Sequence, residues 1–132
     1  MKQKSRTLLA VLVPLGLGIF TALLFLVNYL NKNRAIVTIK NQSGYDLIGG
    51  QLRITSQPKE QEVGAIGNND SAKIQFEKFG EGHYEFAGQF RDGKTMRDSG
   101  GYLNSGASYK DVILIKAMKD SLVAEVRQVV FK

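Results

Sequence analysis

The sequence predicts an all-β protein, an antiparallel β-sandwich of the immunoglobulin-like kind with about seven or eight strands, preceded by one N-terminal transmembrane helix. Three observations carry this prediction. The residues from Thr7 to Leu30 form an uninterrupted uncharged block. After Arg34 the pattern changes to short runs of β-branched and aromatic residues, separated by turn residues. No stretch after residue 34 combines a helical period with capping residues.

The uncharged block is long enough to cross a bilayer. Its 24 residues would span roughly 36 Å as a helix, against a hydrocarbon core of about 30 Å. The alternative is a cleaved signal peptide, whose apolar stretch is about 7–15 residues and ends in a small-x-small site. This block is longer and no Ala-x-Ala pattern follows it, so we expect an uncleaved anchor. Gly18 and Ala22 form a small-xxx-small pair, which predicts a helix-packing position.

Flanking charge predicts the orientation of this anchor. Three basic residues precede the block and two follow it, which favours a cytoplasmic N-terminus. The chain has no cysteine, which favours a bacterial rather than an animal secretory origin. We therefore expect a single-pass protein of a bacterial inner membrane with a periplasmic β domain. The predicted layout is a basic cytoplasmic tail (1–6), a transmembrane helix (7–30), a juxtamembrane linker (31–34) and the β domain (35–132).

Eight runs in the β domain are expected to be strands. Alternation places Ile74 with Phe76, and Tyr84 with Phe86, on the core faces of their strands. Asp92-Gly93 signals a hairpin, and Gly49-Gly50 a bulge. A transthyretin-like or lipocalin-like arrangement of the strands stays open as an alternative. The predicted strands are Ala35–Lys40, Leu47–Thr55, Gln61–Ile66, Ala72–Glu77, His83–Arg91, Lys94–Asp98, Tyr109–Ala117 and Leu122–Phe131.

The net charge of +6 does not predict a nucleic-acid partner. Residues 1–34 hold five basic residues and no acidic one, whereas residues 35–132 hold 13 basic and 12 acidic residues. The excess charge therefore lies in the membrane flanks, and the near-neutral domain does not indicate the basic stripe of a nucleic-acid binder.

The β domain contains few residues of the types that form catalytic or metal-binding sites. Without cysteine there is no thiolate metal site, iron–sulfur cluster or thiol nucleophile. The single histidine, His83, would need Glu81 and Glu85 to hold a metal, and we expect it to be a solvated surface residue. No Gly-x-Ser-x-Gly elbow or glycine-rich phosphate cradle occurs. We therefore predict a protein that is not an enzyme and has no cofactor or metal.

The segment Ser99–Ser108 is predicted to be a flexible Gly/Ser/Asn loop that makes contacts. Loops on a β scaffold often carry binding residues, and tyrosine is favoured at interfaces. The expected partner-binding residues are Tyr102, Leu103, Asn104 and Tyr109. The predicted function is binding of another protein, as an accessory subunit of a membrane complex. The alternatives are a periplasmic immunity or exclusion protein and a lipid- or small-molecule-binding β domain.

Overall fold

The computed structural model describes residues 2–31, 33–128 and 130–131. The chain divides into two compact units, residues 1–32 and 33–132. The first unit is the single helix α1, Lys2–Asn31. Its window Ala10–Tyr29 has a mean hydropathy of 2.6, and none of that window is buried against protein. This helix is long and apolar enough to cross a membrane, as the sequence predicts.

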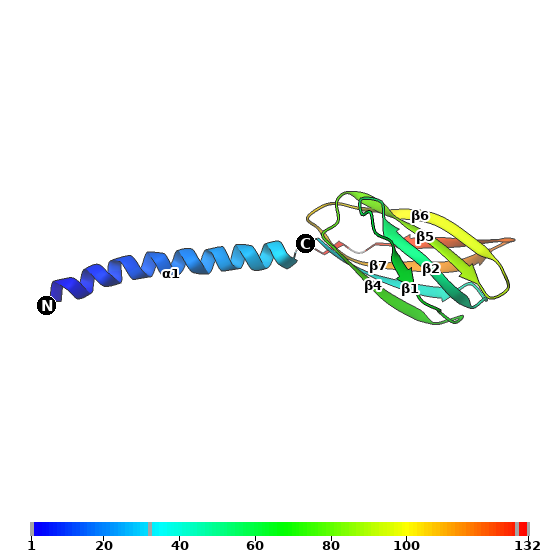
Figure 1. Ribbon diagram of the computed structural model, residues 1–132, viewed down its shortest axis with the longest axis horizontal. Helices are drawn as coiled ribbons and strands as arrows, with labels where there is room; N and C mark the ends of the chain where they lie inside the picture. Colours follow the sequence, from blue (N-terminus) through cyan, green and yellow to red (C-terminus); the bar gives the residue numbers. More distant parts are fainter. Residues whose placement is uncertain (1, 32, 129, 132) are drawn as a thin grey trace. The chain divides into compact units, whose positions relative to one another are not determined.

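The second unit is a β-sandwich, which confirms the predicted fold class. Figure 1 shows its strands in two layers. One sheet has the order β4-β1-β7-β8, with β9 paired to β7, and the other has the order β3-β2-β5-β6. The strands are β1 Arg34–Gln42, β2 Leu47–Ile54, β3 Gln61–Val63, β4 Ser71–Glu77, β5 Gly82–Phe90, β6 Thr95–Leu103, β7 Ser108–Met118, β8 Ser121–Arg127 and β9 Val130–Phe131.

Strand order separates the arrangements that the sequence left open. The strands form two distinct sheets and not the closed barrel of a lipocalin. With β1 to β8 lettered A to H, the sheets read DAGH and CBEF, whereas an immunoglobulin constant domain has ABED and CFG. Strands β1 and β7 pair in parallel, whereas the other strand pairs among the described residues are antiparallel.

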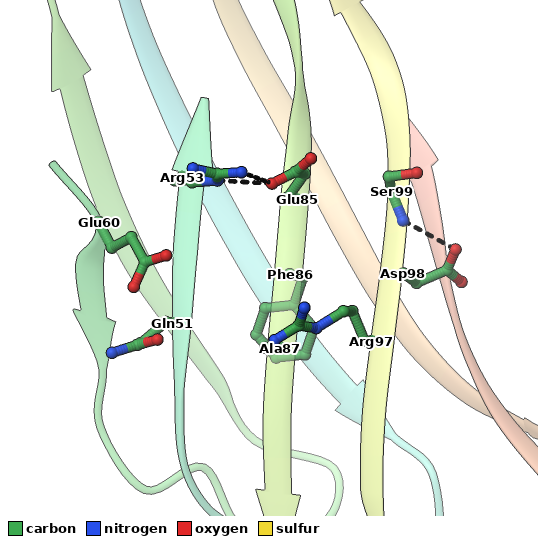
Figure 2. Close-up of a pocket in the computed structure, with 9 residues that line it drawn as sticks. All are labelled: Gln51, Arg53, Glu60, Glu85, Phe86, Ala87, Arg97, Asp98 and Ser99. Atoms are coloured by element: carbon green, nitrogen blue, oxygen red, sulfur yellow. Dashed lines mark hydrogen bonds and ion pairs between the residues drawn. The ribbon is translucent and has the colours of Figure 1, made fainter. Parts of the chain in front are cut away.

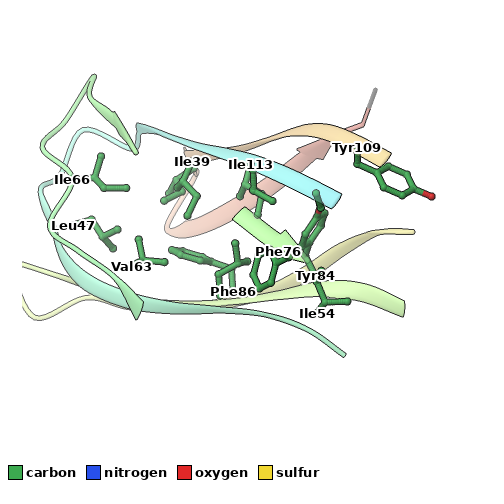
Figure 3. Packing of buried hydrophobic residues seen from close by; sticks show 14 of the residues in the cluster. Ile39, Leu47, Ile54, Val63, Ile66, Phe76, Tyr84, Phe86, Tyr109 and Ile113 are labelled. Atoms are coloured by element: carbon green, nitrogen blue, oxygen red, sulfur yellow. The ribbon is translucent and has the colours of Figure 1, made fainter. Parts of the chain in front are cut away.

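The core lies between the two sheets and is built from alternate residues of their strands (Figure 3). Phe76, Tyr84 and Phe86 are at most 2% exposed, as the alternation predicts. The bulge expected at Gly49-Gly50 occurs as a shift of register between Leu47 and Gly49. Gly50 is required there because a Cβ at this position would lie 2.4 Å from the carbonyl oxygen of Ala87.

Two predicted boundaries differ from the structure. The run Gln61–Ile66 forms a strand only over Gln61–Val63, after which Ile66 makes an isolated bridge to Leu47. The predicted linker 31–34 is shorter, because α1 ends at Asn31 and β1 begins at Arg34. Asn33 is tied into the β domain: its Oδ1 accepts a hydrogen bond from the Gly106 amide at 3.2 Å, and its carbonyl accepts one from the Lys78 amide at 3.0 Å.

Candidate functional site

The segment Ser99–Ser108 is mostly strand, so the prediction of a flexible loop there is wrong. The predicted contact role of its residues is untested. Strand β6 continues through Gly100 and Gly101 to Leu103, and only residues 104–107 connect it to β7. Gly101 has a φ of +71°, and a Cβ there would lie 2.9 Å from Cγ1 of Val126 on β8. These glycines therefore let the edge strands β6 and β8 approach closely. A glycine-rich sequence is equally typical of a flexible loop, so the residue types alone do not show which of the two occurs.

Tyr102 is one of the predicted contact residues that lie at the surface. It is 57% exposed. The side chain of Gln128 makes two hydrogen bonds with the backbone of Tyr102. Its Oε1 accepts from the Tyr102 amide at 2.8 Å, and its Nε2 donates to the Tyr102 carbonyl at 3.0 Å. The structure thus presents an exposed aromatic ring from a backbone that is fixed in place.

The other predicted contact residues divide between core and surface. Leu103 is 0% exposed and Tyr109 is 2% exposed, so both side chains pack in the core and are not available at the surface. The Tyr109 hydroxyl accepts a hydrogen bond from the amide of Asn104 at 2.8 Å. Asn104 itself is exposed at the end of β6. Of the four residues, Tyr102 and Asn104 are exposed at the surface.

A buried polar contact lies behind this edge. Asp111 of β7 is 1% exposed and accepts a hydrogen bond from the Tyr84 hydroxyl at 2.7 Å, across the sandwich. Gln128 Nε2 lies 3.3 Å from the same carboxylate oxygen, so one side chain contacts both Asp111 and the backbone of Tyr102. Burial and the Asp111 hydrogen bond strongly raise the pKa of Tyr84, which keeps its hydroxyl protonated as a donor. This contact was not predicted from the sequence.

An open depression of about 430 Å³ lies on the outer face of the β3-β2-β5-β6 sheet (Figure 2). Arg53 and Glu85 pair across it at 2.5 Å, and this hydrogen bond lowers the pKa of Glu85. Arg97 lies over the small side chain of Ala87 and makes no hydrogen bond or ion pair with another described residue. A second, more open depression of about 560 Å³ adjoins the first and shares Gln51, Ala87 and Arg97.

The expected absence of a metal site and the predicted helix-packing position stay untested. His83 is half exposed, and its Nε2 lies 3.8 Å from Oε1 of Glu85. Within the described ranges, no group of three or more His, Cys, Asp or Glu side chains is placed to hold a metal ion. On α1, Gly18 and Ala22 are exposed, and a Cβ added at Gly18 would meet nothing within 4 Å.

Comparisons with known proteins support the fold and nothing finer. No protein-family model matches the chain, and no curated protein matches it. Among solved structures, the chain resembles the NMR structure of a protein from Eubacterium rectale, with a TM-score of 0.54 and 17% sequence identity. The match covers 74% of this chain and 92% of that one. At this identity the resemblance establishes a shared β fold, found in a bacterial protein.

Proposed function

We propose that this chain is a single-span protein of a bacterial inner membrane whose periplasmic β-sandwich binds another protein, as an accessory subunit of a membrane complex. In this proposal the N-terminus is cytoplasmic and the domain has a binding role without enzymatic activity. The anchor in the proposal is α1, whose apolar window Ala10–Tyr29 is exposed along its whole length. The charge bias across that helix, with Lys2, Lys4 and Arg6 on its N-terminal side, supports the orientation.

The observation that carries the binding role is Tyr102. A large aromatic side chain that is 57% exposed on a fixed backbone has the character of an interface anchor, because little conformational entropy remains to be lost on binding. Support also comes from the interior. Among the described residues, every buried side-chain nitrogen or oxygen has a hydrogen-bond partner, so the sandwich needs no ligand to complete its core.

The small-molecule alternative is less well supported. A lipid-binding sandwich requires a cavity between its sheets. The gap that lies between the sheets near Tyr84, Phe86 and Ile113 has a volume of about 0 Å³ for a water-sized sphere. The two larger depressions lie on the outer surface and are polar in part. We therefore place recognition on the outer surface of the domain.

The test is co-purification of the full-length, C-terminally tagged protein from its native membrane in mild detergent. Tyr102→Ala should lower the recovery of a stoichiometric partner at least tenfold, because truncation of an interface anchor costs about 2 kcal/mol or more. The matched control is Tyr45→Ala, which removes a 36% exposed tyrosine from the loop between β1 and β2.

Three results would count against the proposal or narrow it. Recovery of the wild-type protein alone, from membranes in which it is expressed at its native level, would overturn the accessory-subunit function. An equal loss of partner in both tyrosine variants would remove Tyr102 as the anchor. A partner that appears only when cells meet a toxin or an incoming conjugation machine would favour the immunity or exclusion function instead.

A further inference from the structure

Charge is unevenly distributed between one outer face of the sandwich and the other residues from 34 to 132. In β1 the residues Ala35, Val37 and Ile39 are fully buried, so the alternate residues of that strand point outward. Extending this alternation across the paired strands β4, β7 and β8 gives the outward set of the sheet. We call this surface the basic face, and its six basic residues are Arg34, Lys40, Lys73, Lys110, Lys116 and Arg127.

The acidic residues of the basic face are few and already paired. Glu77 lies 3.5 Å from Arg34. Glu125 contacts Lys116 at 2.6 Å and Arg127 at 2.8 Å. With six basic and two acidic side chains the face carries +4, whereas the other residues from 34 to 132 hold eight basic and ten acidic side chains, a charge of −2. The domain is near neutral as a whole, but its positive charge is concentrated on the basic face.

Two lysines of the basic face are available to a partner. Lys40 and Lys73 are exposed on adjacent strands, and neither makes an ion pair with another described residue. The register pairs Lys40 with Ser71 and Thr38 with Lys73, so the two lysines are diagonal neighbours. An acidic side chain placed against them would find two ammonium groups without competing carboxylates from the face itself.

Apolar side chains lie among the charged ones on the basic face. Ile36, Val112 and Val123 are partly buried, and Leu114 is 6% exposed although it points away from the core between the sheets. The register places Leu114 beside Lys40. A surface that combines apolar and charged side chains is typical of a protein interface. Nucleic-acid binding relies instead on many cations aligned with phosphates, and two available lysines among apolar side chains fit that poorly.

From these observations we propose that the basic face docks an acidic surface of the partner protein. This inference rests on the proposed function and adds the docking surface and the charge of what binds there. A two-fold contact of this face with the same face of a second copy is excluded by charge, because it would place +4 against +4. Four strands about 4.8 Å apart and about 26 Å long make a flat footprint of roughly 500 Å². A contact of that size is weak alone, and joint anchoring in one membrane would strengthen it.

The test uses the full-length protein in its native membrane with two matched charge-reversal variants. Lys40→Glu/Lys73→Glu changes the basic face, and Lys59→Glu/Arg97→Glu makes the same change in net charge away from that face. We expect the first variant to lower partner recovery about tenfold and the second to leave it within about twofold, because only the first replaces attraction by repulsion. Thermal melting must show that both variants remain folded.

A photo-crosslinking residue at position 73 then identifies what touches the face, with position 89 on the opposite sheet as control. The expected result is a protein adduct from position 73 whose crosslinked segment in the partner is rich in Asp and Glu. A neutral or basic partner segment, a lipid or nucleic-acid adduct, or loss of recovery only in the Lys59→Glu/Arg97→Glu variant would overturn the inference while leaving partner binding intact. If wild-type protein yields neither a co-purifying protein nor an adduct at any position, the proposed function fails and the docking surface fails with it.

Discussion

Asp111 is a carboxylate placed almost entirely inside an apolar core, and its hydrogen bonds decide whether that position is tolerable. Burying a polar group without hydrogen-bond partners costs free energy. Removing one partner of a buried pair leaves the other group unsatisfied and so lowers the stability of the folded protein. Tyr84→Phe deletes the hydroxyl that donates to Asp111 at 2.7 Å and changes little else. We expect the free energy of unfolding to fall by about 1–3 kcal/mol in a denaturant titration. Tyr102→Phe is the control, and a comparable loss there would contradict the account.

At the same scale, Glu125 predicts how stability depends on pH. Its hydrogen bonds with Lys116 and Arg127 lower its pKa from the ordinary value of 4.5 to about 2. A carboxylate whose pKa is lower in the folded protein stabilises it above the unfolded pKa, and this contribution is lost as pH falls from about 4.5 to about 2. Melting temperatures across that window should decline less steeply in Glu125→Gln than in the wild type.

The control for this titration is Glu62→Gln, because Glu62 is an exposed glutamate without an ion pair to another described residue. Its melting curve should follow that of the wild-type protein at every pH. Equal slopes for all three proteins would show that the Lys116–Glu125–Arg127 cluster does not persist in solution.

At the scale of the element, β6 depends on one backbone conformation. Gly101→Ala places a Cβ 2.9 Å from Val126 at a φ of +71°, where an L side chain is strained. The expected loss of stability is about 1–2 kcal/mol. Gly64→Ala is the matched control, since a Cβ at Gly64 would meet nothing within 4 Å, and it should change stability by less than about 0.5 kcal/mol. Similar unfolding free energies for the two variants would refute the close approach of β6 and β8.

The elements differ in how much the sequence reveals of them. Strands β4 and β5 were predictable because each has one buried and one solvated face, which gives a clean alternation of residue types. Strand β6 was not, because glycines that permit close packing have the composition of a loop. The parallel pairing of β1 with β7 leaves no local signal, since it depends on residues far apart in the chain.

The residues of the candidate surfaces could also be predicted only in part from the sequence. Tyr102 was identified from its residue type, although the expected loop around it is a strand. The basic face was missed because net charge was summed along the chain, whereas the face collects residues from four separate strands. Leu103 of β6 and Tyr109 of β7 were assigned to a surface because burial on a strand depends on register, and the registers of these two strands could not be read from the sequence.

For the whole molecule, the expectation is integral membrane association with one exposed domain. The protein should resist alkaline carbonate extraction, because a helix with the hydropathy of Ala10–Tyr29 partitions into the bilayer core. In spheroplasts, added protease should digest a C-terminal tag, whereas an N-terminal tag should be protected. Protection of the C-terminal tag in intact spheroplasts would reverse the proposed orientation, and release by carbonate would remove the anchor.

The parallel pairing of β1 with β7 constrains how this domain is made. Ala35 pairs with Tyr109, which lies 74 positions further along the chain. During synthesis β1 emerges first among the strands, yet its neighbour in the sheet is nearly the last to appear. Pairings of such long sequence separation carry a large loop-closure entropy and form slowly. The domain therefore completes its fold only after β7 has been synthesised, so premature termination before β7 leaves the edge of β1 that faces β7 unpaired and prone to aggregation.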